Sequence, residues 1–231
     1  MFKEIPIAMK VAALFSGGKD SVFAVYIAQQ YGWDVSPLIT LHSEKQDSWM
    51  FHSINIHLTE LLAQAIDIPL VKKSTKGEKE TELIDLKDLL QDLEIDGVFS
   101  GAIASEYQRT RIEKICDEIG IKSFTPLWHK NQKFLLRDQV KAGFHIIIIG
   151  VFAAGFDETW LGKTIDEQTI DALVSLHEKY KINIAGEGGE FETLVLSGPL
   201  FSQKLVIDEF LKEWNRDNGI FQVKSAHLEK R

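Results

Sequence analysis

The chain has 231 residues, 45% of them hydrophobic and 26% charged, which is the composition of a folded domain with a sizeable core and an ordinary water-exposed surface. Its formal net charge of −8 disfavours a broad nucleic-acid-binding surface and adsorption to anionic membranes. The longest apolar run, residues 146–156, is too short to span a bilayer, and the first residues lack the layout of a signal peptide. The single cysteine, Cys116, excludes an intrachain disulfide, so we expect a cytoplasmic protein.

The first half of the chain alternates short apolar runs with segments of helical periodicity. The expected strands are residues 10–15, 35–41, 68–71, 97–100 and 121–124, and the expected helices are residues 22–31, 54–66, 78–93 and 106–119. This alternation predicts an α/β fold, with an open parallel sheet and helices on both faces. Because such sheets bind ligands beyond the carboxyl ends of their strands, the pattern selects the loops 16–21, 42–52 and 101–109 as candidate binding loops.

The second half of the chain reads differently. The expected helices are residues 134–142 and 166–180, and the β runs are residues 145–152, 193–197 and 204–208. A cluster of glycines and acids occupies residues 186–192, and the final thirty residues carry no motif. The pattern predicts a smaller C-terminal α+β lobe. We place the domain boundary between residues 125 and 126, giving domains 1–125 and 126–231 that pack tightly because no flexible linker separates them.

A glycine loop follows the first expected strand and reads Ser16-Gly17-Gly18-Lys19-Asp20-Ser21. Its glycines have no Cβ, so backbone amides can approach a phosphate, and the amino end of the next helix adds N–H groups and a positive dipole end. Lys19 can neutralise phosphate charge, while the two serines can donate hydrogen bonds. The loop matches neither the Walker A pattern nor the dinucleotide pattern G-x-G-x-x-G. The alternative interpretation is a tight strand-to-helix turn with a polar cap.

The loop resembles the pyrophosphate loop of N-type ATP pyrophosphatases, and other stretches resemble one branch of that superfamily, the diphthine–ammonia ligase family. Those stretches are residues 48–52, residues 101–109 with Arg111, residues 126–128 and residues 186–193. The resemblance runs from about residue 10 to Phe201. It implies a fold like that of the adenine nucleotide alpha hydrolases, with residues 1–125 as the nucleotide-binding domain and residues 126–231 as the substrate-binding domain.

The resemblance also implies an activity, that of an AMP-forming carbon–nitrogen ligase. Diphthine, a modified histidine of translation elongation factor 2, carries a carboxylate that ATP would adenylate. Ammonium would then convert the acyl-adenylate to the amide, and AMP and pyrophosphate would be released. ATP and Mg²⁺ are the expected cofactors, and elongation factor 2 bearing diphthine and ammonium are the expected partners. No membrane or nucleic-acid partner is expected, and a homodimer is left open.

The same resemblance assigns roles to individual residues. The expected catalytic residues are Lys19, Asp20, Arg109, Glu187 and Glu190. The nucleotide would be bound by Ser16, Gly17, Gly18, Lys19, Asp20, Ser21, His42, Gly101 and Ser105. The substrate would be bound by His52, Tyr107, Gln108, Arg109, Gly188, Gly189, Glu190, Glu192 and Thr193. No side-chain spacing predicts a direct metal site, and Asp20 is either an indirect Mg²⁺ ligand or a helix cap.

Two of these assignments rest on chemistry that has a structural alternative. Arg109 could grip a phosphate or a carboxylate bidentately, or it could pair with Glu106 or Glu113 on a solvated helix face. The acids of residues 187–192 could attract ammonium, deprotonate it as a general base or bind the trimethylammonium group of diphthine. Their alternative is an acidic loop with a β-bulge. The alternative for His52 is a structural or surface position, and His42 is expected near the nucleotide base or at the surface.

Other enzymes with the same kind of loop require residues that can be looked for in the sequence. Thiolating tRNA-modifying enzymes use a persulfide cysteine, usually with a second cysteine, and lysidine-type ligases need more positive charge than this chain carries. Sulfonucleotide reduction needs a C-terminal cysteine motif, which the final thirty residues lack. Amide synthesis on a small-molecule carboxylate stays open, and so does a nucleotide-binding module without turnover.

Overall fold

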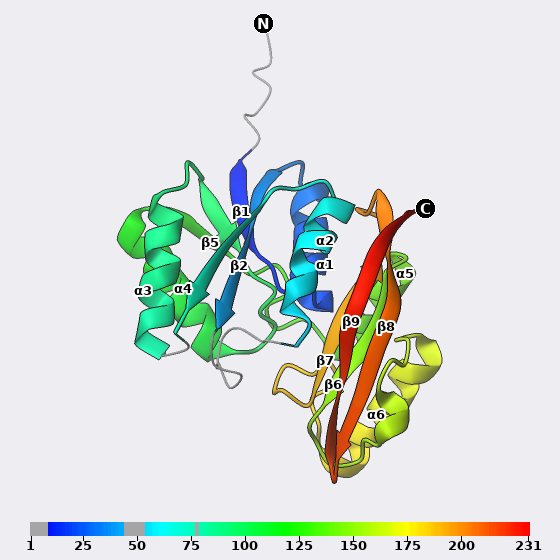
Figure 1. Ribbon diagram of the computed structural model, residues 1–231. Coiled ribbons are helices and arrows are strands. Elements are labelled where there is room, and N and C mark those ends of the chain that lie inside the picture. The colour runs from blue at the N-terminus through cyan, green and yellow to red at the C-terminus, as the bar shows by residue number, and fades with distance from the viewer. Residues whose placement is uncertain (1–8, 44–53, 77–78) are drawn as a thin grey trace, which may run out of the picture.

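The computed structural model describes residues 9–43, 54–76 and 79–231, which form two sheets with helices around them (Figure 1). The first sheet has five parallel strands in the order β3-β2-β1-β4-β5. Its strands are β1 (Lys10–Leu14), β2 (Asp34–Ser43), β3 (Leu70–Thr75), β4 (Gly97–Phe99) and β5 (Lys122–Phe124). Strand β1 pairs with β2 on one side and β4 on the other, so that Ala13 lies opposite both Leu38 and Phe99. The predicted open parallel sheet is confirmed.

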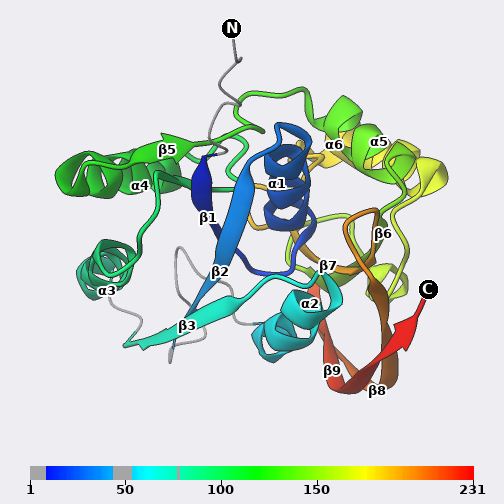
Figure 2. The same cartoon turned by 90° about the horizontal axis from the view of Figure 1, so that it is seen from above.

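Helices cover both faces of the parallel sheet, as the alternating pattern predicts (Figure 2). Helices α1 (Lys19–Gln30) and α2 (Thr59–Ala65), the latter preceded by the 3-10 turn η1 (Ile56–Leu58), pack on one face. Helices α3 (Lys79–Gln91) and α4 (Glu106–Ile119) pack on the other. Side chains of β1 alternate between the two cores, because successive residues of a strand point to opposite faces.

The second sheet is antiparallel and has the order β7-β6-β9-β8. Its strands are β6 (His145–Val151), β7 (Phe191–Ser197), β8 (Gln203–Asn215) and β9 (Asn218–Lys230). Helices α5 (Gln132–Lys141) and α6 (Glu167–Tyr180) and the 3-10 turn η2 (Glu158–Trp160) complete this lobe. An α+β lobe at the C-terminal end is therefore confirmed.

The expected helix of residues 54–66 is shorter, since α2 begins at Thr59 after the 3-10 turn η1, and two further elements also differ from the sequence-based expectations. Strand β3 begins at Leu70 rather than at residue 68, because Ile68 belongs to the turn that ends α2 and its N–H bonds to the carbonyl of Ala63. The last residues of the chain form a long β8–β9 hairpin, of which only residues 204–208 were expected. Much of β8 is solvent-exposed, so its side chains lack the strict alternation by which a half-buried strand is recognised.

One hydrophobic core runs from the parallel sheet into the C-terminal lobe. It joins Val22 and Leu62 of the first half to Ile148 and Leu194 of the second. The backbone N–H of Val195 on β7 also donates to the carbonyl of Gly17, at 3.0 Å. The two halves therefore meet directly at the end of β1, where the glycine loop begins.

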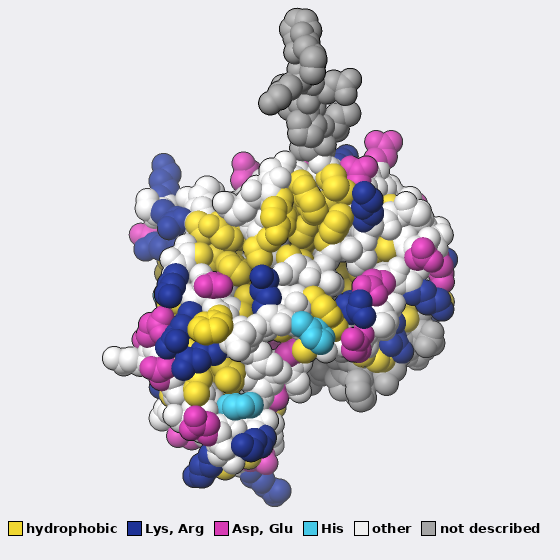
Figure 3. Space-filling model, turned by 180° about the vertical axis from the view of Figure 1, so that it is seen from behind, with side chains coloured by type: hydrophobic (Ala, Val, Ile, Leu, Met, Phe, Trp, Pro, Cys, Tyr) yellow, Lys and Arg dark blue, Asp and Glu magenta, His cyan; other side chains and the backbone are white. Residues whose placement is uncertain are grey.

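The surface carries charges of both signs. On the face seen in Figure 3, basic and acidic side chains are interspersed, and hydrophobic side chains gather in a patch near the upper edge. Within the described residues, no helix has the length and apolar character that crossing a membrane requires.

Candidate active site

A pocket lies at the carboxyl ends of β1 and β4, where the strand order of the parallel sheet reverses. Ligands of open α/β sheets bind at such a reversal. The predicted residues that line the pocket are Ser16, Gly18, Lys19, Asp20, Ser21, Gly101, Gln108, Glu187, Glu192 and Thr193. Apolar side chains such as Phe15, Ile39 and Ile112 supply the rest of its wall. Two of the three predicted loops, and the acidic cluster, thus converge on one cavity.

The glycine loop is held by its own serines. The hydroxyls of Ser16 and Ser21 lie 3.2 Å apart, and the N–H of Gly18 donates to the Ser16 hydroxyl at 3.3 Å. Gly17 has a φ of +78°, a left-handed conformation that favours glycine, and an added Cβ would lie 2.5 Å from Leu62 Cδ1. Gly17 therefore shapes the turn and does not line the pocket. Helix α1 begins at Lys19, so its amino end faces the cavity.

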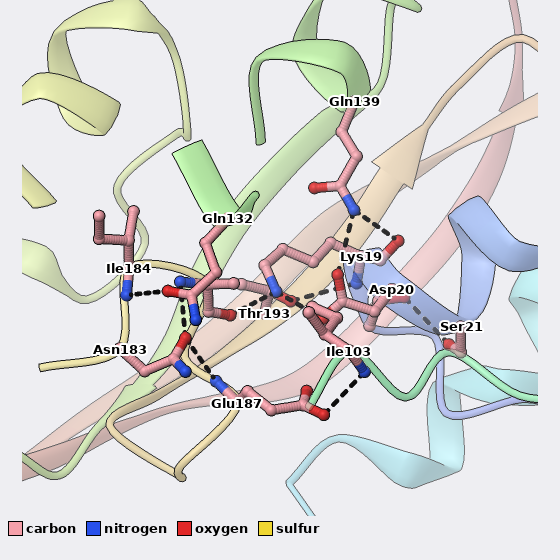
Figure 4. Close-up of polar contacts among 12 residues, drawn as sticks. Lys19, Asp20, Ser21, Ile103, Gln132, Gln139, Asn183, Ile184, Glu187 and Thr193 are labelled. Carbon is pink, nitrogen blue, oxygen red and sulfur yellow. Dashed lines mark hydrogen bonds and ion pairs between the residues drawn. The ribbon is translucent and has the colours of Figure 1, made fainter. Parts of the chain in front are cut away.

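Lys19 is almost completely buried, with 4% of its surface exposed. Its ammonium donates to the carbonyl of Ala185 at 2.6 Å and forms an ion pair with Asp20 (Figure 4). Its backbone N–H donates to the hydroxyl of Thr193 at 3.1 Å. A buried charge needs such partners, because leaving it unpaired away from water is costly. Both partners outside α1 come from the second half of the chain.

Glu187 of the acidic cluster also lines the pocket. Its Oε1 accepts hydrogen bonds from three successive backbone N–H groups, those of Ile103, Ala104 and Ser105, at 2.8, 2.9 and 3.1 Å. Figure 4 shows the first of these, from Ile103. Converging amides of this kind stabilise a negative charge. Glu187 therefore joins the acidic cluster to the loop that precedes α4. Its expected catalytic role stays a prediction.

The other members of the acidic cluster have different surroundings. Glu190 accepts hydrogen bonds from the N–H groups of Asn183 and Gly188, at 2.8 and 2.9 Å, so its carboxylate holds the loop together from inside. Gly188 and Gly189 are exposed and do not line the pocket. Glu192 does line it. The expected substrate-binding roles of these residues stay predictions.

Helix α4 places its predicted residues on different sides. Ser105 caps the helix by accepting from the N–H of Gln108, and Gln108 lines the pocket. Arg109 points elsewhere: its guanidinium donates to Glu106 and Glu113 at 3.0 and 2.6 Å and lies over the Trp128 ring. The hydrogen bond and charge of Glu106, with a further contribution from Glu113, raise the pKa of Arg109.

The neighbouring aromatic and basic side chains of α4 also lie outside the pocket. The guanidinium of Arg111 lies 3.5 Å from the centre of the Tyr107 ring, and neither residue lines the cavity. In this structure Arg109 therefore has the pairing expected of a solvated helix face. The roles predicted for Tyr107 and Arg109 have no further support from their positions and stay predictions.

Gly101 is required by a close approach of two loops. A Cβ on Gly101 would lie 2.7 Å from the backbone carbon of Asp20 and 2.7 Å from the backbone nitrogen of Ser21. Real Cβ atoms do not approach backbone so closely, so a side chain here would push the glycine loop away from β4. Gly101 thus helps to set the width of the pocket.

Only one of the two predicted histidines lies within the described residues. His42 is an exposed residue of β2 and is not part of the lining. His52 lies outside the described residues, together with the rest of the stretch 48–52. Their expected roles in nucleotide and substrate binding stay predictions.

Sequence reasoning missed two polar residues at the site. Ser100 follows β4, is 4% exposed and lines the pocket, and its hydroxyl has no hydrogen-bond partner among the described residues. Gln139 of α5 is fully buried and donates to Asp20 Oδ1 at 3.1 Å. Ser100 could have been found from its position at a strand end beside the glycine loop. Gln139 carried no local signal, because it stands inside an ordinary helix.

The residues present fit a nucleotide in this pocket. The glycine loop and the amino end of α1 suit phosphates, and the unpartnered buried hydroxyl of Ser100 suits a polar ligand. Among the described residues, no group of three or more His, Cys, Asp or Glu side chains could hold a metal ion. A parallel sheet with a glycine loop and a helix amino end at its strand reversal is typical of nucleotide-binding α/β proteins.

Comparison with known proteins specifies this class further. Residues 9–123 match the family model described as the diphthamide synthase N-terminal domain, and residues 131–228 match that of the diphthamide synthase C-terminal domain. The chain therefore belongs to the diphthamide synthase family. Its relatives include proteins named diphthine–ammonia ligase from several eukaryotes.

The similarity to these relatives extends over most of the chain. The ligase of Rattus norvegicus is 37% identical over 223 residues, which cover 87% of this chain and 83% of the relative. That of Homo sapiens is 34% identical with the same coverage. That of Schizosaccharomyces pombe is 38% identical over 221 residues, but this chain spans only 36% of its length.

A solved structure is similar in outline. It is described as a predicted subunit of tRNA methyltransferase from Methanocaldococcus jannaschii, and it shares 17% identity at a TM-score of 0.48 over 83% of this chain and 98% of that chain. A likeness at that level carries no conclusion about function.

Proposed function

We propose that this chain catalyses the ATP-dependent conversion of diphthine on elongation factor 2 to diphthamide, with ammonium as the nitrogen source. The observation that carries the proposal is the match of both halves to diphthamide synthase domains, together with the convergence of the glycine loop, the loop before α4 and the acidic cluster on one pocket. We place the boundary between the nucleotide-binding and substrate-binding domains near residue 125. Elongation factor 2 acts in the cytoplasm, so the proposal includes a cytoplasmic location.

The first step assigned to the pocket is activation of the diphthine carboxylate. A carboxylate is a poor electrophile, so its oxygen attacks the α phosphate of ATP, pyrophosphate leaves, and a mixed anhydride with AMP forms. The N–H groups at the start of α1 and the hydroxyls of Ser16 and Ser21 would stabilise the phosphate charge. Lys19 would contribute its ammonium by exchanging the Ala185 carbonyl for a phosphate oxygen.

Mg²⁺ would enter bound to the phosphates. Such an ion usually keeps several water ligands and needs only one or two protein carboxylates. Asp20 lines the pocket beside Lys19 and is the nearest candidate for an indirect contact through water. When bound, the ion would supply further positive charge at the α phosphate.

The second step is the attack of ammonia on the acyl-adenylate. Ammonium must lose a proton before its nitrogen can attack the carbonyl carbon, and AMP then leaves with the bonding electrons. The acidic side of the pocket would attract ammonium, and Glu192 and Glu187 line that side. Both carboxylates are therefore candidates for receiving the proton.

The test is a reconstituted reaction. Purified protein is incubated with ATP, Mg²⁺, ammonium and elongation factor 2 that carries diphthine; unmodified elongation factor 2 is the control. We expect AMP and pyrophosphate, and mass spectrometry should show the carboxylate of diphthine converted to the amide. Release of ADP and phosphate would overturn the proposed chemistry. AMP release without any change in the factor would mean that water, and not ammonia, receives the activated group, and would overturn the proposed amidation.

A further inference from the structure

Gln139 lies on α5 of the C-terminal lobe, yet its side chain reaches the start of α1. It has no exposed surface, and its Nε2 lies 3.1 Å from Asp20 Oδ1 and 3.5 Å from the carbonyl oxygen of Lys19 (Figure 4). These contacts connect positions 119 and 120 residues apart in the chain. A buried polar side chain at the second layer of the pocket therefore contacts two consecutive residues of the glycine loop.

The chemistry of the contacts fixes the orientation of the amide. Both contacted atoms are acceptors, a carboxylate oxygen and a carbonyl oxygen, so only the NH₂ group of Gln139 can face them. With the amide flipped, three oxygens would face one another without a proton. The remaining oxygen, Oε1, has no partner among the described residues. The protein thus leaves one buried acceptor unpaired while both N–H donors are directed at the glycine loop.

The donated bond completes the surroundings of Asp20. One carboxylate oxygen of Asp20 pairs with the Lys19 ammonium and the other accepts from Gln139. The ammonium of Lys19 in turn donates to the Ala185 carbonyl. A side chain from the other lobe therefore contacts the carboxylate that pairs with the Lys19 ammonium.

We propose that Gln139 is a positioning residue, whose N–H donors orient Asp20 and Lys19 for the phosphates of ATP. The inference rests on the proposed nucleotide-binding function of this pocket. A misplacement of about 1 Å at a catalytic group can reduce a rate by about 100-fold, so loss of this donor should be measurable. Gln139 acts through Asp20 and Lys19 and does not line the pocket itself.

The test compares three variants for ATP affinity by calorimetry and for AMP release. Gln139→Met keeps the volume and removes the donor; we expect ATP affinity and kcat/KM for ATP to fall about 10- to 100-fold. Gln222→Met is the matched control, because Gln222 stands on β9, accepts from the Lys224 ammonium and does not line the pocket. It should bind ATP as the wild type does.

A second variant, Gln139→Glu, distinguishes the effect of losing the hydrogen-bond donor from the effect of altered packing. Its carboxyl group can donate a proton to Asp20 only when neutral, and burial beside Asp20 favours the neutral form. The charged group that faces it is the Asp20 carboxylate, whose other oxygen pairs with the Lys19 ammonium, and Lys19 itself contributes a backbone carbonyl here. We measure the ATP affinity of each variant relative to the wild type as the pH is lowered from about 8 to about 6. The relative affinity of Gln139→Glu should rise, and that of Gln139→Met should not change. This comparison also decides the matter if Gln139→Met fails to fold.

Two results would overturn the inference: wild-type ATP affinity in folded Gln139→Met, or the same pH response in the Glu and Met variants. Failure of the proposed function looks different. In that case the wild type binds ATP and loses affinity on Gln139→Met, but diphthine is not converted to its amide.

Discussion

The backbone N–H of Lys19 donates a 3.1 Å hydrogen bond to the hydroxyl of Thr193, which lies 174 residues later in the chain. Thr193 belongs to β7 of the second sheet, while Lys19 begins α1, which follows the central strand β1 of the first. The Lys19 ammonium is held by the carbonyl of Ala185, also in the second half. Both halves of the chain therefore hold the glycine loop in place. Substitutions in either half should change the affinity for ATP.

Replacing Lys19 tests its charge at the phosphates. Lys19→Met keeps the aliphatic stem and removes the ammonium, so we expect AMP release to fall about 100-fold or more, because one buried donor at developing charge is worth that much. Lys122→Met, at an exposed lysine of β5, is the control and should retain full activity. Near-normal turnover in Lys19→Met would show that the loop does not hold the reacting phosphates.

Replacing Ser100 tests whether its buried hydroxyl forms a hydrogen bond with bound ATP. Because that hydroxyl has no partner among the described residues, Ser100→Ala should not lower the free energy of unfolding, but it should weaken ATP binding by about 1 kcal/mol, or several-fold. Calorimetry and urea unfolding measure the two effects. Thr40→Val is the control, since the Thr40 hydroxyl is buried and donates to the Phe15 carbonyl at 2.6 Å. That variant should lose stability, and a similar loss in Ser100→Ala would exclude the ligand role.

Replacing Glu187 distinguishes a structural role from a catalytic one. Glu187→Gln keeps the shape but loses the charge that three amides stabilise, so the free energy of unfolding should fall by about 1–2 kcal/mol. ATP affinity should fall with it, because the loop of residues 103–105 follows Gly101. Glu209→Gln, at an exposed glutamate of β8, should change neither quantity. A lower kcat with unchanged stability would favour a general base instead.

The single cysteine should affect both the thiol reactivity of the protein and the pH dependence of its free energy of unfolding. Burial is the main cause that raises the pKa of the Cys116 thiol to about 11, so the folded protein should react slowly with thiol reagents at neutral pH. Unfolding in denaturant should release full reactivity. Since the unfolded thiol loses its proton at a lower pH than the folded one, the free energy of unfolding should decrease as pH rises from about 9 towards 11. In Cys116→Ala this part of the pH dependence should disappear, and rapid labelling of the folded wild type would contradict the burial.

The buried thiol also bears on the rival functions. Cys116 packs in the core beneath α4 with 1% of its surface exposed, as its helical spacing predicts. A persulfide carrier needs an accessible thiolate. The position of Cys116 therefore disfavours thiolation chemistry on this chain, in agreement with the sequence-based argument.

Sequence alone determined the parallel sheet, the α+β lobe and the glycine loop of this protein. These features are local: strand and helix periodicity, and the turn chemistry of Gly17 and Gly18, are properties of short segments. The loops 16–21 and 101–109 were also expected at the carboxyl edge, because strand direction dictates it, and residues of both line the pocket.

Only the tertiary structure decided how the individual side chains are used. Among three neighbouring acids, it directs Glu187 to a distant amide cluster, Glu190 into its own loop and Glu192 to the pocket. It also brings Gln139 to Asp20 and Thr193 to Lys19. The physical reason is that hydrogen-bond partners are chosen by the packing of the two lobes across a common core. Contacts between residues more than a hundred positions apart leave no trace in local spacing.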